Sequence, residues 1–133
     1  MITAVDTSVL LEVLADDPAH AEQSEALLTR AYQQGSLIIC PVVYAELAPN
    51  ARDRRQLDGW LHCGGIRTVA LTAEHGYAAG VAHAAHRKAG GERGRILANF
   101  LIGAHALHEA NRLLTRDRGF YREYFSGLEI FAA

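Results

Sequence analysis

Three acidic side chains stand at or just after the ends of short apolar runs, where predicted strands pass into helices or loops. A fourth polar residue, an amide, stands near the start of an apolar helix. The four residues are Asp6, Glu46, Asn99 and Asp117. The carboxyl ends of parallel strands share one edge of an open α/β sheet, and ligands bind at that edge. The pattern therefore predicts that these residues, far apart in sequence, meet at one site.

Clustered carboxylates repel one another, so a group of acids at one site generally requires a cation. Carboxylate and amide oxygens are hard ligands of the kind that Mg²⁺ prefers. We therefore expect a Mg²⁺ or Mn²⁺ site with Asp6 and Asp117 as direct ligands and Asn99 as a third ligand that carries no charge. Glu46 could bind the metal through water or orient a nucleophile, and the sequence leaves both roles open.

Apolar runs of strand length alternate with helical patterns along the whole chain. Predicted strands span residues 2–5, 37–40, 66–71, 112–115 and 128–131. Predicted helices span residues 8–14, 18–34, 41–47, 52–62, 73–88, 96–110 and 119–124, and residues 89–94 form a loop. This alternation predicts an α/β fold with three layers, α/β/α, and a parallel sheet of four to five strands. A length of 133 residues fits one domain, residues 1–133.

The composition favours a folded cytoplasmic protein. Half of the residues are hydrophobic, yet no run approaches the roughly 18 apolar residues of a membrane helix. The chain begins with a strand-like run rather than a secretion signal. Cys40 and Cys63 are too few and too far apart for a zinc motif or a disulfide framework, so we expect two reduced, partly buried thiols.

The net charge of −2 conceals an uneven distribution. Residues 1–50 carry a charge of −6 and residues 51–133 carry +4, and 12 of the 13 basic residues are arginines. Arginine suits bidentate contacts with phosphate better than lysine does. A basic rim around an acidic metal centre is compatible with a nucleic-acid substrate, although most of these arginines are expected to form ordinary surface ion pairs.

Four segments together carry a family resemblance. They are residues 5–11 (VDTSVLL), 43–47 (VYAEL), 96–106 (ILANFLIGAHA) and 114–120 (LTRDRGF). In order, spacing and total length the chain resembles a PIN-domain nuclease of the VapC type, the toxin half of bacterial toxin–antitoxin pairs. Each segment alone is weak, but the four in order are specific, and the resemblance covers essentially the whole chain.

The resemblance implies a three-layer fold, an acidic site for Mg²⁺ or Mn²⁺, and cleavage of RNA phosphodiester bonds. Asp6, Glu46 and Asp117 correspond to the acidic residues, and Thr115 corresponds to a hydroxyl that supports the site. Arg95 and Arg116 are predicted to contact the substrate. The resemblance also implies a cognate antitoxin that wraps the toxin, and a homodimer.

The chain departs from the family pattern at position 99, where the family has Asp. Asn99 keeps one carbonyl oxygen for a metal, but it has no negative charge and cannot act as a general base. The change is either an engineered inactivation or a natural weakening. The other motif residues are intact, which favours the engineered explanation.

Other functions are compatible with parts of the pattern. A non-catalytic module that binds RNA or protein is supported by Asn99, and a phosphotransfer receiver lacks the expected lysine. Asp6 taken alone could be a helix cap. The histidine pairs at 83 and 86 and at 105 and 108 have a spacing that zinc could use, but no cysteine or acid lies nearby at a matching spacing.

Overall fold

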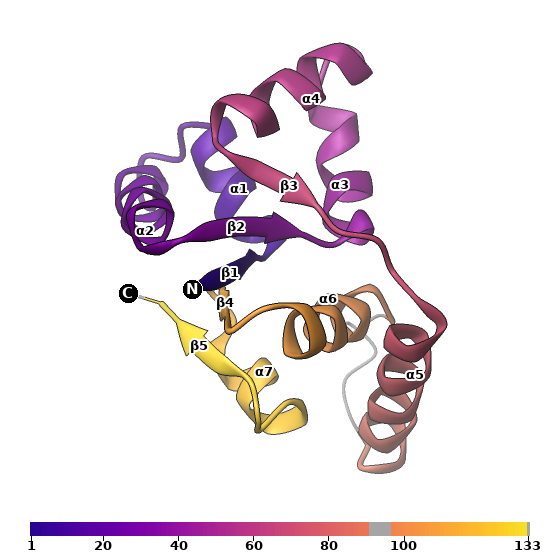
Figure 1. Ribbon diagram of the computed structural model, residues 1–133. Helices are drawn as coiled ribbons and strands as arrows, with labels where there is room; N and C mark the ends of the chain where they lie inside the picture. Colours follow the sequence, from indigo (N-terminus) through magenta and orange to yellow (C-terminus); the bar gives the residue numbers. More distant parts are fainter. Residues whose placement is uncertain (91–96, 133) are drawn as a thin grey trace.

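The computed structural model describes residues 1–90 and 97–132, and it contains a five-stranded sheet in which every neighbouring pair is parallel (Figure 1). The strands are β1 (Ile2–Val5), β2 (Ser36–Ile39), β3 (Ile66–Thr68), β4 (Arg112–Leu114) and β5 (Glu129–Phe131). Their order across the sheet is β3-β2-β1-β4-β5. The predicted α/β class with a parallel sheet is confirmed.

Seven α-helices and one 3₁₀ turn connect the strands of the described chain. They are α1 (Thr7–Leu14), α2 (Ala21–Gln34), α3 (Pro41–Leu47), η1 (Ala48–Asn50), α4 (Arg54–Cys63), α5 (Ala73–Lys88), α6 (Leu97–Glu109) and α7 (Arg118–Tyr124). Helices α1–α4 lie on one side of the sheet and α5–α7 on the other (Figure 1). Right-handed crossovers require this division, because the chain moves in one direction from β1 to β3 and then returns to place β4 on the far side of β1. The predicted α/β/α layering is therefore confirmed.

The three central strands form the middle of the core. Val5, Ile39 and Leu113 expose 1% or less of their surface. Strands covered on both faces are apolar at consecutive positions rather than at alternate ones. This is why runs such as residues 37–40 are continuously hydrophobic.

The order of the strands reverses between β1 and β4. The backbone N–H of Asp6 donates to the carbonyl of Leu114 at 2.9 Å, so the ends of the two strands are held together. From this point α1 leaves on one face of the sheet and α7 on the other (Figure 1). Diverging connections of this kind leave a crevice at the carboxyl edge, where open α/β sheets bind ligands.

Helix α2 differs from the prediction for residues 18–34. Pro18 does not lie in its first turn, because Asp17 organises a separate turn: its carboxylate accepts from the N–H of Ala19 at 2.8 Å, and its carbonyl accepts from Ala21 at 2.8 Å. The helix starts at Ala21. Its buried side contains Ser24 together with Leu27 and Ala31, whereas Tyr32 is 59% exposed.

The third strand is shorter than the predicted run of residues 66–71. Its partner β2 ends at Ile39, whose carbonyl accepts from Val69, and beyond this bond the segment has no neighbouring strand to pair with. The chain then continues as an extended connection to α5 (Figure 1). The two thiols also differ from each other: Cys40 is buried as expected, but Cys63 is exposed at the end of α4.

The predicted helix start at Ile96 and most of the predicted loop at residues 89–94 lie outside the described residues. Among residues 1–90 and 97–132, no helix has the length and apolar character that crossing a membrane requires.

Candidate active site

Asp6 is held at the carboxyl end of β1 by hydrogen bonds to both of its carboxylate oxygens. It is the N-cap of α1, and its Oδ1 accepts from the backbone N–H of Thr7 at 2.8 Å. Its Oδ2 accepts from the hydroxyl of Thr115 at 2.7 Å. The pairing of β1 with β4 brings these two residues together across the point where the strand order reverses. The carboxylate is only 6% exposed and has a fixed orientation.

Thr115 connects Asp6 to Asp117. Its hydroxyl donates to Asp6 and accepts from the backbone N–H of Asp117 at 3.0 Å. The threonine is 1% exposed, so this connection is shielded from water. A supporting hydroxyl at Thr115 was expected from the family resemblance; it bonds to the Asp6 carboxylate and to the Asp117 backbone, and its role in a reaction stays a prediction.

Glu46 reaches the same edge of the sheet from α3. Its Oε1 accepts from the hydroxyl of Thr7 at 2.7 Å, while the residue as a whole is exposed. One threonine thus contacts two acids, through its N–H to Asp6 and its hydroxyl to Glu46. An exposed carboxylate next to a buried one has room to contact water or a bound ligand.

Burial raises the pKa of the Asp6 carboxyl above its usual value. The hydrogen bonds from Thr115 and Thr7 oppose this increase, and the negative charge of Glu46 adds to it. Without a cation, the folded chain therefore holds the Asp6 carboxylate at a cost. A bound cation would favour the charged form and remove that cost.

Tyr121 of α7 is a residue of this site that the sequence did not identify. Burial raises the pKa of its phenol, and the charges of Asp6 and Asp117 raise it further, while a contact with the Asn99 amide lowers it. The Asn99 amide of α6 and the two aspartates are thus neighbours of one phenol. In the sequence Tyr121 stands close to Tyr124 and Phe125, and this run of aromatic residues matches a packed core and does not indicate a site.

The oxygen atoms of this site are of the kind that binds a divalent cation, although position 99 supplies a neutral amide and no charge. Each oxygen of Asp6 accepts one hydrogen bond and keeps a further lone pair, and Asn99 offers a carbonyl oxygen. Carboxylate and carbonyl oxygens are ligands of Mg²⁺ and Mn²⁺. Among residues 1–90 and 97–132, no three side chains of His, Cys, Asp or Glu are grouped closely enough to hold a metal ion.

The two arginines predicted to contact substrate have different positions. Arg95 lies outside the described residues. The guanidinium of Arg116 donates to Glu12 at 3.1 Å, to Gln23 at 2.6 Å and to Ser24 at 2.9 Å. These bonds join the end of β4 to α1 and α2. The Arg116 guanidinium therefore links three elements of the fold, and no substrate contact is proposed for it.

The histidines at zinc-compatible spacing contact other protein groups. His105 and His108 bond to the carbonyls of Val69 and Ala104, each at 2.8 Å. His86 bonds to the hydroxyl of Tyr124 at 2.7 Å, and the ring of His83 packs edge-on against a neighbouring aromatic ring. In these contacts the four histidines bond to or pack against other groups of the protein.

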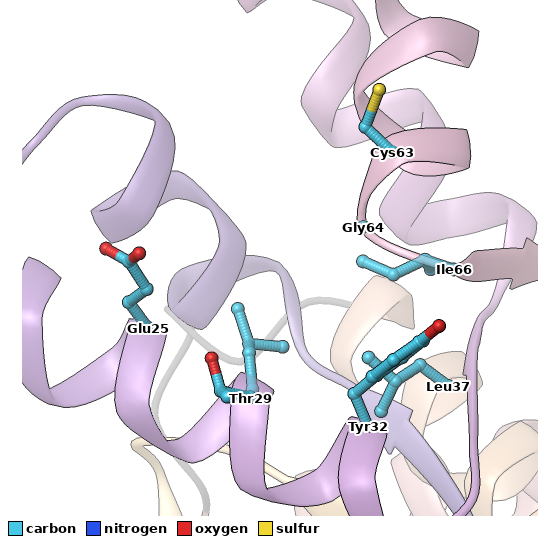
Figure 2. A pocket seen from close by; sticks show the side chains of 8 residues that line it. Glu25, Thr29, Tyr32, Leu37, Cys63, Gly64 and Ile66 are labelled. Atoms are coloured by element: carbon cyan, nitrogen blue, oxygen red, sulfur yellow. The ribbon is translucent and has the colours of Figure 1, made fainter.

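A separate concave surface lies on the face of the sheet that carries α1–α4. One part, with a volume of about 430 Å³, lies between α2 and the junction of α4 with β3, where Thr29, Tyr32 and Ile66 line it (Figure 2). An adjoining apolar part of about 130 Å³ shares Ile66 and includes Trp60 of α4. This surface is distinct from the acidic site, since neither part includes any of the site residues described above.

A buried and an exposed carboxylate that both bond to Thr7, at the switch point of a parallel sheet, define an α/β domain with an acidic ligand site. The model of the PIN domain family matches residues 3–125. The chain therefore belongs to the PIN domain family, whose members are generally nucleases.

Solved structures agree with this assignment at the level of the fold. One chain of VapBC2 from Rickettsia felis, bound to a DNA fragment from its promoter, matches with a TM-score of 0.75 and 19% identity, covering 99% of this chain and 98% of that one. A chain of VapBC-1 from nontypeable Haemophilus influenzae gives 0.72 and 18%, with 99% and 98% covered. A chain of a toxin–antitoxin complex from Klebsiella pneumoniae gives 0.61 and 15%, with 95% and 94% covered. No curated protein matches the sequence.

Proposed function

We propose that this chain is a VapC-type toxin, a metal-dependent endoribonuclease that Asn99 disables. The observation that carries the proposal is the hydrogen-bonded network of Asp6, Thr115 and Asp117 at the switch point of a PIN domain, with Glu46 joined to it through Thr7. An acidic site of this kind suits an anionic substrate only when a cation is bound. A phosphodiester is such a substrate, and cytoplasmic RNA is the proposed source.

Each residue of the acidic site would have a defined role in this reaction. Asp6 and Asp117 would hold Mg²⁺ or Mn²⁺, with Asn99 as a neutral third ligand. The bound metal would lower the pKa of its water and offset charge on the phosphate. Thr115 and Thr7 keep the Asp6 carboxylate oriented. Glu46, which is exposed and next to this carboxylate, would bind the metal through water or orient the attacking water.

The substitution Asn99→Asp tests the proposal directly. It adds a negative charge to the site with almost no change of shape, so it is expected to restore discrete, metal-dependent cleavage of total RNA. The measurement compares the two proteins with Mg²⁺ or Mn²⁺, and adds a third protein that carries both Asn99→Asp and Glu46→Gln. Cleavage that depends on position 99 and is strongly reduced by the second change supports a nuclease.

A different result would favour the alternative, a non-catalytic module. If Asn99→Asp is folded and binds Mn²⁺ but cuts no RNA under any of these conditions, the catalytic proposal fails. Binding of RNA by the unaltered chain, measured in the same samples, would then identify the binding module.

We also propose that a cognate antitoxin covers the concave surface beside α2 and α4, and that the toxin forms a homodimer. The support for a partner is the apolar lining of this surface together with the likeness to chains solved in VapBC and toxin–antitoxin complexes. Trp60 lines the apolar part and is the only tryptophan of the chain. Its fluorescence is therefore a direct reporter of occupancy.

The partner is tested by expressing the chain with the product of a neighbouring gene that encodes a small DNA-binding protein. Co-purification together with a shift of the Trp60 emission would support docking here. Replacing Ile66 with Asp should weaken the complex, whereas Arg55→Ala, at an exposed site on α4, should leave it intact. A complex that forms without any change at Trp60 would place the partner on another face.

A further inference from the structure

Tyr121 has a buried hydroxyl without a hydrogen-bond partner. The residue is 0% exposed, and its Oη has no partner that meets hydrogen-bond geometry among the described residues. A buried polar group left in this state costs free energy that a phenylalanine would not cost. The hydroxyl therefore calls for an explanation beyond packing of the ring.

The ring of Tyr121 is fixed by its neighbours, which fixes the direction of the hydroxyl. Its centroid lies 5.0 Å from that of Phe120 and 6.3 Å from that of Phe125. Its backbone N–H donates to the carbonyl of Asp117 at 3.4 Å, so α7 starts from the site itself. A rigid ring on a helix anchored at Asp117 cannot easily turn its hydroxyl elsewhere.

The polar groups that this hydroxyl meets are those of the proposed metal site. The Asp6 carboxyl and the Asn99 amide are polar neighbours of this hydroxyl, and the charge of Asp117 acts on it as well. The phenol has only one proton to donate. Each oxygen of the Asp6 carboxylate already accepts one hydrogen bond. The amide at position 99 is a weaker acceptor for the phenol proton than a carboxylate would be.

We propose that Tyr121 is a positioning residue of the metal site, whose hydroxyl donates to a carboxylate at position 99 and sets its distance from Asp6. The expected effect on metal binding rests on the proposed function, whereas the contact itself does not. A charged acceptor forms a stronger hydrogen bond than an amide does. The unpaired hydroxyl is therefore expected to gain a bond when position 99 carries a carboxylate.

The experiment combines Tyr121→Phe with Asn99→Asp in the full-length chain. Two quantities are measured for all four proteins: the equilibrium constant of unfolding in urea without metal, and the dissociation constant for Mn²⁺. Tyr124→Phe is the matched control, because it removes a hydroxyl from the same helix that bonds to His86 instead of the site.

The proposal expects the two substitutions to be coupled. Tyr121→Phe should disfavour unfolding slightly in the unaltered chain, because it removes an unpaired buried hydroxyl, and should favour unfolding about fivefold in the Asn99→Asp protein, where it removes a hydrogen bond to a charged acceptor. In the Asn99→Asp protein it should also weaken Mn²⁺ binding about tenfold, as loss of a group that orients a ligand does. Tyr124→Phe should leave Mn²⁺ binding unchanged.

The two proposals fail in different ways. If Tyr121→Phe changes the equilibrium constant of unfolding equally with Asn and with Asp at position 99, the positioning role is overturned, whatever the metal affinity. An unchanged Mn²⁺ affinity would also overturn it, provided that the Asn99→Asp protein binds the metal. If the Asn99→Asp protein binds no metal and cuts no RNA, the proposed function fails, and the unfolding measurement alone decides the contact.

Discussion

A buried carboxylate at the end of β1 is the residue on which this site depends. Asp6 is 6% exposed, and both of its oxygens are bonded to groups that hold them in place. Removal from water disfavours the charged form, and two hydrogen bonds only partly compensate. Such a residue lowers the stability of the chain without metal, and under the proposed function it is a ligand whose orientation is set before the metal binds.

We therefore expect Asp6→Asn to stabilise the chain without metal and to abolish binding of Mn²⁺. Because the pKa of Asp6 is raised in the folded state, folding takes up protons above the unfolded pKa, and this carboxyl reduces stability as pH rises. The gain from Asp6→Asn should grow from about pH 4 towards neutrality and reach about 1 kcal/mol, the usual scale for relieving such a site.

Urea unfolding at pH 4 and pH 7, with a Mn²⁺ titration, measures both effects. Glu25→Gln, which removes the same charge from an exposed position on α2, is the control and should change neither. Destabilisation by Asp6→Asn at pH 7 would contradict the cost that burial is argued to impose.

The sequence predicted some of these residues because their position in the pattern is informative. An acid directly after an apolar strand, as at Asp6, can be a helix cap or part of a site at the sheet edge, and the further acids at similar positions favour the site. The contribution of Tyr121 could not be predicted in this way, because an aromatic residue in a helix next to other aromatic residues matches a core pattern. Periodicity indicates that such a ring is buried, but the atoms that its hydroxyl meets depend on how α7 leaves β4.

At the scale of elements, α6 approaches α7 closely at a glycine. A methyl group on Gly103 would overlap the ring of Phe125, which follows α7 directly. Gly103 lies in the buried stretch of α6, four residues after Asn99. The contact therefore fixes the distance between the two helices that carry Asn99 and Tyr121.

Gly103→Ala is expected to destabilise the chain by about 1–3 kcal/mol, because the ring or the helix must shift to admit the methyl group. Gly80→Ala is the matched control, since a methyl group at Gly80 on α5 meets no atom within 4 Å. It should stabilise the chain by up to about 1 kcal/mol through helix propensity. Thermal unfolding of both proteins measures the difference, and equal effects would show that α6 and α7 adapt without cost.

The elements were predicted better than their edges and faces. Strand β2 and helix α5 agree with their patterns, since long apolar or small-residue runs allow few other structures. The start of α2 was wrong because Asp17 uses both its side chain and its carbonyl to form a turn. The burial of Ser24 is not evident from the local pattern either, because the partner of its hydroxyl, Arg116, lies 92 residues further along the chain.

At the scale of the whole molecule, one histidine joins helix α6 to the segment that follows β3. His105 of α6 is 0% exposed, and its Nε2 lies 2.8 Å from the carbonyl of Val69, at the exit of β3. This bond requires a proton on Nε2, so a neutral ring leaves Nδ1 without a proton, and Nδ1 is buried without a partner. The titratable groups facing it are His75 of α5, with ring centroids 5.0 Å apart, and Glu109 of α6.

Burial lowers the pKa of His105 in the folded chain, and the nearby His75 lowers it further. The bond to Val69 and the charge of Glu109 oppose this decrease. Between this lowered pKa and the unfolded value of about 6.5, the unfolded chain binds more protons than the folded one. Stability contributed by the neutral ring is thus complete above about pH 6.5 and is lost as pH falls through the window below it. The loss cannot exceed about 1.4 kcal/mol per pH unit, the limit for one proton.

His105→Gln keeps a side-chain N–H that can reach the carbonyl of Val69 but removes the titrating group. The slope of unfolding free energy against pH, measured in urea between pH 5 and pH 8, should therefore be smaller in this protein than in the unaltered chain. His62→Gln, at an exposed site on α4, should leave the slope unchanged. If His105→Gln does not fold, an NMR titration of the unaltered chain measures the same quantity, and a His105 pKa at or above 6.5 would contradict the argument. A reduced slope would mean that mild acid weakens the attachment of α6 to β3, and with it the support of the helix that carries Asn99.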